Sequence, residues 1–163
     1  MSAAQIQVLK ANLNDVRHAD AVRTLINAYA MDPMGEGAPL DADVLDRLIP
    51  GLRAHPTTLA LLAFADGDPC GVALCFLGFS SFAARPLLNI HDLAVLPAYR
   101  GRGVGRALLS AAEDSARALG CCKLTLEVLD KNTVALNAYI AAGFKRYTLQ
   151  ADAGEAIFMS KAL

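Results

Sequence analysis

The most informative stretch of this sequence is Arg100-Gly101-Arg102-Gly103-Val104-Gly105. An apolar, strand-like run over 87–95 precedes it, and small and apolar residues recur at helical spacing after it as far as Gly120, a typical helix stop. A strand, a glycine loop and a helix together can bind an anion, because the amides at a helix start lack intrahelical partners and the helix dipole adds positive charge. Arg100, Arg102 and Arg106 add three cations. Taken alone, the pattern also suits a plain β-to-α turn whose glycines serve geometry only.

The spacing of the glycines excludes two common phosphate-binding loops. A P-loop needs a Lys-Ser or Lys-Thr pair after its last glycine, and none follows here. A dinucleotide fingerprint needs Gly-x-Gly-x-x-Gly at the first strand-to-helix turn, but Arg106 or Leu108 stands at the third glycine position, past mid-chain. The pattern left, Arg-x-x-Gly-x-Gly, resembles the pyrophosphate-binding signature of the GNAT superfamily of acyl-coenzyme A N-acyltransferases.

A second segment carries the same resemblance. Residues 132–144 read Asn-Thr-Val-Ala-Leu-Asn-Ala-Tyr-Ile-Ala-Ala-Gly-Phe and predict a short helix that begins near Asn132 and ends at Gly143. They are similar to the family motif Asn-x-x-Ala-x-x-x-Tyr-x-x-x-Gly-Phe at every marked position. The two motifs follow in the family's order, with a predicted strand over 123–128 between them. The resemblance covers essentially the whole chain and is strongest from Ile90 to Phe144.

Composition sets the broad class of the protein. The chain has 163 residues, 55% of them hydrophobic, which predicts a folded single domain over 1–163. No apolar run approaches the roughly 18 residues of a spanning helix, and the N-terminus has no signal-peptide pattern, so we expect a cytoplasmic protein without membrane association. Fifteen basic and sixteen acidic residues give a net charge of −1, which argues against nucleic-acid binding. The four cysteines lack a Cys-x-x-Cys pair, so reduced thiols and no metal site are expected.

The apolar patterning predicts the order β-α-α-β-β-β-α-β-α-β-β. The first strand is expected over 5–11, a helix capped by Asn14 or Asp15 follows, and a second helix starts at Asp41 or Asp43. The remaining predictions are a hairpin over 58–64 and 70–79, a strand over 87–95, the two motif helices and, besides the strand over 123–128, two final strands over 145–149 and 156–161. This order implies an α/β (mixed α+β) fold, a central mixed sheet with helices on both faces, as in the GNAT fold.

The resemblance implies which residues bind the donor, acetyl-CoA. In the family, the strand before the glycine loop carries Glu-x-Leu-x-Val, and its splayed backbone holds the pantetheine arm and polarises the thioester carbonyl. The matching residues here are His91-Asp92-Leu93-Ala94-Val95. Leu93, Ala94 and Val95 are therefore expected to contact the coenzyme through their main chain. The expected pyrophosphate ligands are Arg100, Gly101, Arg102, Gly103, Val104, Gly105 and Arg106.

The acid and base of the reaction follow from the same comparison. Tyr139 stands where the family has its general acid, a hydroxyl that donates to the coenzyme sulfur, although a helical tyrosine is also a common core residue. Asn132 caps its helix and in the family also contacts the coenzyme. His91 replaces the family's glutamate base; histidine suits that work because its ordinary pKa is near ~6.5, and ordered water is the alternative. His91 is expected on the strand face of Leu93 and Val95, and Asp92 on the opposite face unless a bulge re-aims it.

The acceptor is less well defined by the sequence. Residues 78–95 resemble the corresponding region of the diamine/polyamine acetyltransferase branch. Acidic residues crowd the loop after the first predicted helix and the start of the second helix, residues 32–46, which in this fold border the acceptor site. Asp32, Glu36 and Asp92 are therefore candidates for binding a cationic amine. The acidic residues also suit a plain solvated helix start. The histidine in place of glutamate weakens a specific assignment to polyamines.

The leading hypothesis is an acetyl-CoA-dependent N-acetyltransferase that acts on a small-molecule primary amine by direct attack in a ternary complex. Acetylation of a protein lysine or N-terminus is the alternative within the same class. A non-catalytic acyl-CoA sensor and a nucleotide-phosphate binder are alternatives outside it. The resemblance also implies a homodimer, and an edge strand over 156–161 is compatible with one.

Overall fold

The computed structural model describes residues 5–150 and 152–163, and the chain divides into two compact units, Met1–Leu126 and Glu127–Leu163. The first unit contains all but one of the described elements: β1 Ile6–Lys10, α1 Val16–Met31, α2 Ala42–Ala54, β2 Thr58–Ala65, β3 Asp68–Ser80, β4 Arg85–Val95, a 3-10 turn Pro97–Tyr99, α3 Val104–Ala118 and β5 Leu124–Leu126. The second unit contains α4, Thr133–Ala141.

The sheet of the first unit is mixed, as predicted. Its five strands lie in the order β1-β2-β3-β4-β5; the first four are antiparallel to their neighbours, and β5 runs parallel to β4. The α3 helix connects these two parallel strands. The hairpin between β2 and β3 turns at Asp66-Gly67, whose φ angles are +51° and +94°. Positive φ at both positions is the geometry of a type I′ turn, which Asp-Gly favours.

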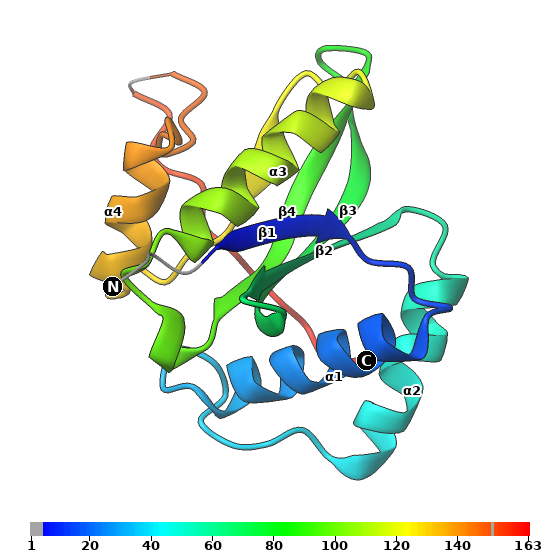
Figure 1. Ribbon diagram of the computed structural model, residues 1–163. Helices are drawn as coiled ribbons and strands as arrows, with labels where there is room; N and C mark the ends of the chain where they lie inside the picture. Colours follow the sequence, from blue (N-terminus) through cyan, green and yellow to red (C-terminus); the bar gives the residue numbers. More distant parts are fainter. Residues whose placement is uncertain (1–4, 151) are drawn as a thin grey trace. The chain divides into compact units, whose positions relative to one another are not determined.

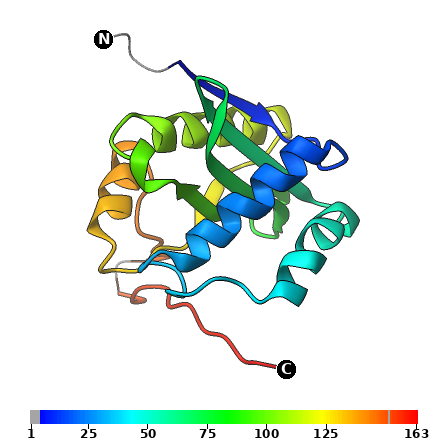
Figure 2. The same cartoon turned by 60° about the horizontal axis from the view of Figure 1, so that its bottom comes forward.

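Helices cover both faces of this sheet (Figures 1 and 2). The α1 and α2 helices lie on one face, where Val22, Leu25, Ile49 and Leu52 form a buried cluster with the strand residues Leu62, Val72 and Leu74. The α3 helix lies on the opposite face and buries Val104, Leu108 and Ala112. Because side chains alternate along a strand, residues 72 and 74 of β3 face α1 and α2, and residues 71 and 73 face α3.

Gly71 sets how closely α3 approaches the sheet. A Cβ atom there would lie 3.0 Å from Cγ1 of Val104 and 3.1 Å from Cδ1 of Leu108, so a larger residue would push the helix away. Gly71 pairs with Val95 across the β3–β4 ladder. The close approach therefore places the first turn of α3 beside the end of β4, where the sequence predicts the donor site.

The helix boundaries largely follow the predicted caps. The Asp15 carboxylate accepts hydrogen bonds from the amides of Arg17 and His18 and begins α1. Asp41 precedes α2. At the end of α3, the Gly120 amide donates to Arg117 O and the Cys121 amide to Ala116 O, and Gly120 has a φ of +69°. This hydrogen-bond pair is a Schellman motif, which explains why the helix ends at a glycine.

Two predicted strands, over 145–149 and 156–161, are not formed. A strand needs a hydrogen-bonded neighbour, and within the described part of Glu127–Leu163 there is one helix and no strand to offer a ladder. The apolar residues of these segments are exposed; Ile157, Phe158 and Met159 each retain at least 75% of their accessible surface. The edge strand that was compatible with a homodimer is therefore absent, and the dimer prediction rests on the resemblance alone.

The strand predicted over 123–128 is shorter than expected. It spans Leu124–Leu126 and pairs with residues 88–90 of β4. The pairing stops where β4 changes register against β3, at His91.

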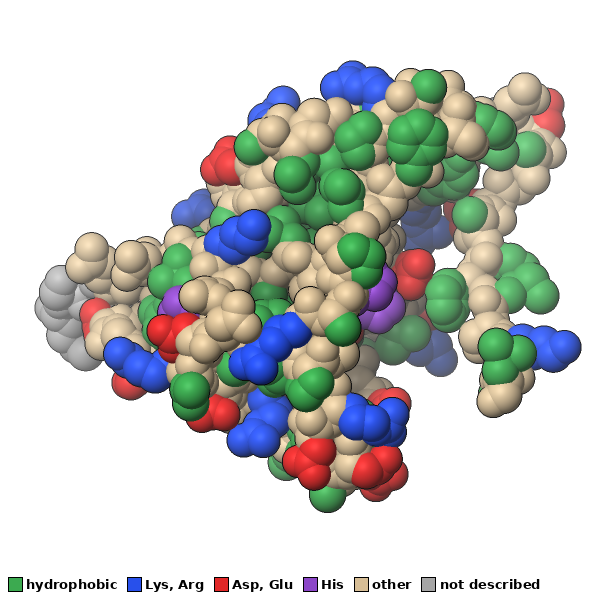
Figure 3. All heavy atoms as spheres, turned by 90° about the vertical axis from the view of Figure 1, so that its right-hand side faces the viewer, with side chains coloured by type: hydrophobic (Ala, Val, Ile, Leu, Met, Phe, Trp, Pro, Cys, Tyr) green, Lys and Arg blue, Asp and Glu red, His purple; other side chains and the backbone are tan. Residues whose placement is uncertain are grey.

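None of the helices in the described part of the chain is both long and apolar enough to cross a membrane. The exposed hydrophobic side chains of the first unit include Phe79 and Phe82, 67% and 90% exposed, beside the β3–β4 turn. Figure 3 shows hydrophobic side chains gathered at the top of its view, the end at which Figure 1 draws this turn.

Candidate active site

The first turn of α3 has the features of an anion site. Gly103 is its N-cap residue, with a φ of +87°, and no side chain among the described residues caps the helix. The first amides of a helix lack intrahelical partners, so these donors are available to a ligand. Gly101 also has a positive φ, +72°, and no described atom lies within 4 Å of a Cβ placed there. The glycines thus shape the loop and leave its surface open.

Arginine side chains surround this turn. The Arg102 guanidinium lies over the Tyr99 ring, 5.6 Å from its centroid, in a cation–π contact that restrains the side chain beside the glycine loop. Arg106 is exposed on the first turn of α3. Its Nη2 atom would lie 3.9 Å from a Cβ at Gly103. These cations and the α3 amides suit a pyrophosphate group.

The end of β4 has an open backbone edge. Residues 93–95 pair with β3 on one side, while β5 pairs with β4 only at residues 88–90. In the described sheet, the other edge of residues 91–95 therefore has no partner strand. Apart from the Val95 carbonyl, which accepts from Nε of Arg100, the amide and carbonyl groups on this edge are available for hydrogen bonds, as a pantetheine arm requires. The open edge lies at the residues where the family resemblance implies a splayed, coenzyme-binding backbone, Leu93, Ala94 and Val95.

A β-bulge at His91 sets the direction of the polar side chains. Leu74 pairs with Asp92 and Cys75 with Ile90, so His91 is the extra residue of β4. The His91 ring contacts the Phe76 ring at a centroid distance of 5.5 Å, and Phe76 packs against the α1–α2 cluster. The expectation that His91 shares the face of Leu93 and Val95 is therefore wrong. The inserted residue turns His91 to the α1–α2 face, which Asp92 and Ala94 share by strand alternation.

Asp92 is a half-buried carboxylate in an unusual setting. The carboxylate accepts no hydrogen bond from the described residues, although buried polar groups normally have a partner. Burial raises the pKa of its carboxyl above the ordinary value, and the neighbouring His91 partly offsets this rise. A cationic or hydrogen-bonding ligand would satisfy the group.

Tyr29 is a site residue that the sequence did not indicate. It lies in the last turns of α1 and faces both Asp92 and Asp32: burial first, and then the charges of these two carboxylates, raise the pKa of its hydroxyl. The sequence pattern places Tyr29 in the apolar stripe of the helix, and its polar neighbours come from other elements. The α1–β4 face thus brings together Tyr29, His91 and Asp92.

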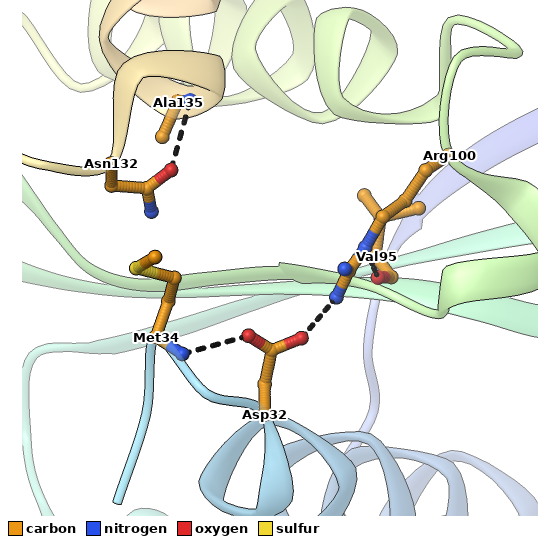
Figure 4. Close-up of polar contacts among 6 residues, drawn as sticks. All are labelled: Asp32, Met34, Val95, Arg100, Asn132 and Ala135. Atoms are coloured by element: carbon orange, nitrogen blue, oxygen red, sulfur yellow. Dashed lines mark hydrogen bonds and ion pairs between the residues drawn. The ribbon is translucent and has the colours of Figure 1, made fainter. Parts of the chain in front are cut away.

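Asp32 and Arg100, predicted to bind different ligands, bind each other (Figure 4). Nη2 of Arg100 donates to Oδ2 of Asp32 at 2.5 Å, and Nε of Arg100 donates to the Val95 carbonyl at 3.0 Å. Oδ1 of Asp32 accepts from the Met34 amide at 2.9 Å. The hydrogen bond from Arg100, and then that from Met34, hold the pKa of Asp32 below its ordinary value. Glu36, the third acidic candidate, is exposed, and its amide donates to Ala30 O.

The motif helix of the second unit has the predicted ends. Oδ1 of Asn132 accepts from the Ala135 amide at 3.2 Å and caps α4 (Figure 4). Gly143, with a φ of +92°, follows the helix. Tyr139 is half-buried, and its ring contacts the Phe144 ring at a centroid distance of 5.9 Å.

The four cysteines are free thiols, of which Cys70 and Cys75 are buried. Burial, together with the charge of Asp92, raises the pKa of the Cys75 thiol to about 12. Cys75 is therefore a packing residue with no nucleophilic thiolate at neutral pH.

Comparisons with known proteins identify a family and a fold that match this chain. The sequence model of the family described as "Acetyltransferase (GNAT) family" matches residues 22–144. The chain is 42% identical over 80 residues to streptothricin acetyltransferase of Streptomyces lavendulae, across 49% of this chain and 40% of that protein. It is 30% identical over 145 residues to the uncharacterized N-acetyltransferase YhfO of Bacillus subtilis, across 84% of this chain and 91% of YhfO.

A solved structure of the aminoglycoside N-acetyltransferase AAC(6')-Iy in complex with CoA has the same fold, with a TM-score of 0.73 and 20% identity. The match covers 99% of this chain and 98% of that one. The chain spans less than half the length of the first curated relative, and about nine-tenths of YhfO.

Proposed function

The chain belongs to the GNAT family of acetyltransferases and is an acyltransferase, and we propose that it transfers the acetyl group of acetyl-CoA to a primary amine of a small molecule by direct attack in a ternary complex. The observation that carries this proposal is the end of β4. Its open backbone edge lies beside the uncapped N-terminus of α3, and its bulge directs His91 and Asp92 to one face.

The donor side of the proposed site uses backbone groups. The α3 amides, with Arg102 and Arg106, hold the pyrophosphate, and the open edge of residues 93–95 aligns the pantetheine arm. A main-chain amide on this edge polarises the thioester carbonyl. Asn132 contributes a further coenzyme contact, as in the family.

The acceptor side uses the polar side chains of the α1–β4 face. Asp92 binds the amine, and His91 takes its proton, because an alkylamine with a pKa near ~10 must lose a proton before it attacks. The nitrogen forms a bond to the acetyl carbon, the carbon–sulfur bond breaks, and the nitrogen releases its second proton to solvent, which leaves a neutral amide. The Tyr139 hydroxyl gives its proton to the departing thiolate and regains one from solvent, to which His91 releases the proton that it took.

Small amines are favoured as acceptors by the chemistry of this face and by the relatives. Aminoglycosides are substrates named for two of the relatives, and thialysine for another. A half-buried carboxylate that accepts no hydrogen bond from the described residues suits such a cationic amine. A protein lysine or N-terminus is the alternative acceptor.

A cytoplasmic location, a homodimer and a single domain over 1–163 are further proposals. Analytical ultracentrifugation of the purified chain tests the homodimer.

The test is release of coenzyme A thiol from acetyl-CoA with a panel of amines: an aminoglycoside, a lysine analogue, a polyamine, a lysine peptide and a peptide with a free N-terminus. We expect turnover with one of the small amines. Turnover with the peptides alone would replace the small-molecule acceptor by a protein. Tight coenzyme binding without turnover on any of them would favour a non-catalytic sensor.

His91→Gln tests the base, with His55→Gln as its matched control, because both histidine rings lie against Phe76, at 5.5 and 4.9 Å. We expect His91→Gln alone to lower kcat. Equal effects of the two variants would assign the proton to ordered water.

A further inference from the structure

Arg100 joins two parts of the site that the sequence treats separately. It follows β4 and the 3-10 turn, on the donor side, and its ion-pair partner Asp32 lies 68 residues earlier, at the end of α1. The carboxylate of Asp32 is the less accessible partner: its side chain is 13% exposed, against 52% for Arg100. A hydrogen-bonded ion pair with one half-buried partner holds its geometry better than a pair exposed on both sides.

The turn after α1 is built around the same carboxylate. Oδ1 of Asp32 accepts from the Met34 amide, the Asp32 carbonyl accepts from the Gly35 amide at 2.8 Å, and the Glu36 amide donates back to Ala30 O at 3.0 Å. Gly35 passes so close to the helix that a Cβ there would lie 2.3 Å from the Tyr29 carbonyl oxygen. The turn is therefore compact, and Tyr29 belongs to the helix end that it closes.

The other end of the Arg100 side chain is fixed to the donor strand. Nε donates to the carbonyl of Val95, the last residue of β4. One guanidinium thus spans the end of the strand that carries Asp92 and the end of the helix that carries Tyr29. The planar fork of arginine fixes both directions at once, which a lysine cannot do.

We propose that Arg100 and Asp32 form a strut that sets the spacing between β4 and the last turn of α1, and that they act as positioning residues for the acceptor amine. This inference rests on the proposed function, because the acceptor lies on the α1–β4 face. It gives Arg100 a different task from the pyrophosphate contact that the glycine-loop motif implies. The strut therefore affects the acceptor KM and leaves coenzyme affinity unchanged.

The experiment uses Asp32→Asn, Arg100→Gln and the double variant in the full chain. Asparagine keeps an oxygen for the Met34 amide and removes the charge that holds Arg100, so any loosening of the turn in this variant comes from loss of the ion pair. Arg102→Gln is the comparison for a coenzyme-binding arginine. Glu113→Gln is the matched control, because Glu113 and Arg117 form an ion pair on the solvent side of α3, where both side chains are at least 47% exposed. Circular dichroism checks that each variant is folded. If Arg100→Gln does not fold, Arg100→Lys takes its place.

We expect each single variant to raise the acceptor KM about tenfold, and the double variant no more than either single one, since coupled residues are non-additive. The dissociation constant of coenzyme A, measured by calorimetry, should change by less than about twofold in Asp32→Asn and in Arg100→Gln. It should rise in Arg102→Gln. A tenfold loss of coenzyme affinity in Arg100→Gln, with Asp32→Asn unaffected, would overturn the strut in favour of a pyrophosphate ligand.

Hydrogen exchange separates failure of the strut from failure of the proposed function. Both variants should speed exchange at the Met34, Gly35 and Glu36 amides relative to Glu113→Gln, whether or not an amine is acetylated. If the wild-type chain acetylates no amine, the proposed function fails, and the exchange and coenzyme measurements alone decide the strut. Unchanged exchange in both variants overturns it.

Discussion

The Phe144 ring stands edge-on to the Tyr139 ring, with their centroids 5.9 Å apart, and the backbone of the same two residues closes α4. The Phe144 amide donates to the Tyr139 carbonyl and the Gly143 amide to the Ile140 carbonyl, which is a Schellman motif. The apolar contact that commonly accompanies this motif is here the contact between the two rings. The Gly-Phe pair of the sequence motif therefore fixes the rotamer of the tyrosine proposed as the general acid.

Phe144→Ala should lower kcat about tenfold and leave the KM for acetyl-CoA within about twofold, because a misplaced acid affects the transition state more than binding. Steady-state kinetics with the best amine of the panel measures the split. Phe82→Ala is the control, since Phe82 is 90% exposed. A rise in KM without a change in kcat would contradict a positioning role for Phe144.

Tyr139→Phe should lower kcat about 100-fold, within the range of general acid catalysis, because the ring contact is kept and only the proton donor is lost. Coenzyme affinity, measured by calorimetry, should stay within about twofold of that of the wild type. Tyr147→Phe, in the same unit, is the matched removal of a tyrosine hydroxyl and should retain its rate. Wild-type turnover in Tyr139→Phe would exclude Tyr139 as the acid.

Gly103→Ala tests the glycine loop. Its φ of +87° imposes a left-handed conformation that costs an alanine roughly 1–2 kcal/mol of stability. Gly67→Ala is a strain-matched control: its φ is +94°, it lies in the β2–β3 turn, and a Cβ there has no described atom within 4 Å. Urea unfolding should show a similar loss of stability in both variants. Only Gly103→Ala should weaken coenzyme A binding, by at least about tenfold, because it alters an amide at the helix N-terminus. Equal coenzyme affinity in the two variants would remove the loop from the donor site.

The sequence predicted best those features that depend on neighbouring residues. Asp15 and Asn132 cap their helices because a side-chain oxygen reaches an amide two or three residues on. Gly120 and Gly143 end theirs because a left-handed residue is required there. The apolar patterns also indicated the order of elements as far as α4, and the two motifs indicated the family.

Features that depend on pairing between distant segments were missed. The bulge at His91 is one extra residue relative to β3, so the alternation of β4 alone suggested the wrong face. Tyr29 fitted an apolar helix stripe, and its partners Asp32 and Asp92 became evident only when α1 lay against β4. Residues 145–149 and 156–161 have β-favouring residues, but a strand also requires a partner, and no local pattern supplies one.

Asp92→Asn should increase stability and decrease activity, because the two depend on its charge in opposite ways. Burial raises the pKa of the carboxyl in the folded state, so the folded state binds its proton more tightly than the unfolded chain. Stability then falls as the pH rises from the ordinary carboxyl pKa through the raised one, and the full cost is present above it. Asparagine carries no charge and avoids this cost.

Urea unfolding should therefore show a higher midpoint for Asp92→Asn than for the wild type at pH 7. The difference should shrink as the pH is lowered and Asp92 is protonated. The same variant should raise the KM for a cationic amine at least about tenfold, the range for loss of one charged partner. A lower unfolding midpoint at pH 7 would mean that the ionised carboxylate has a stabilising partner in solution, and that Asp92 anchors the fold instead of binding the amine.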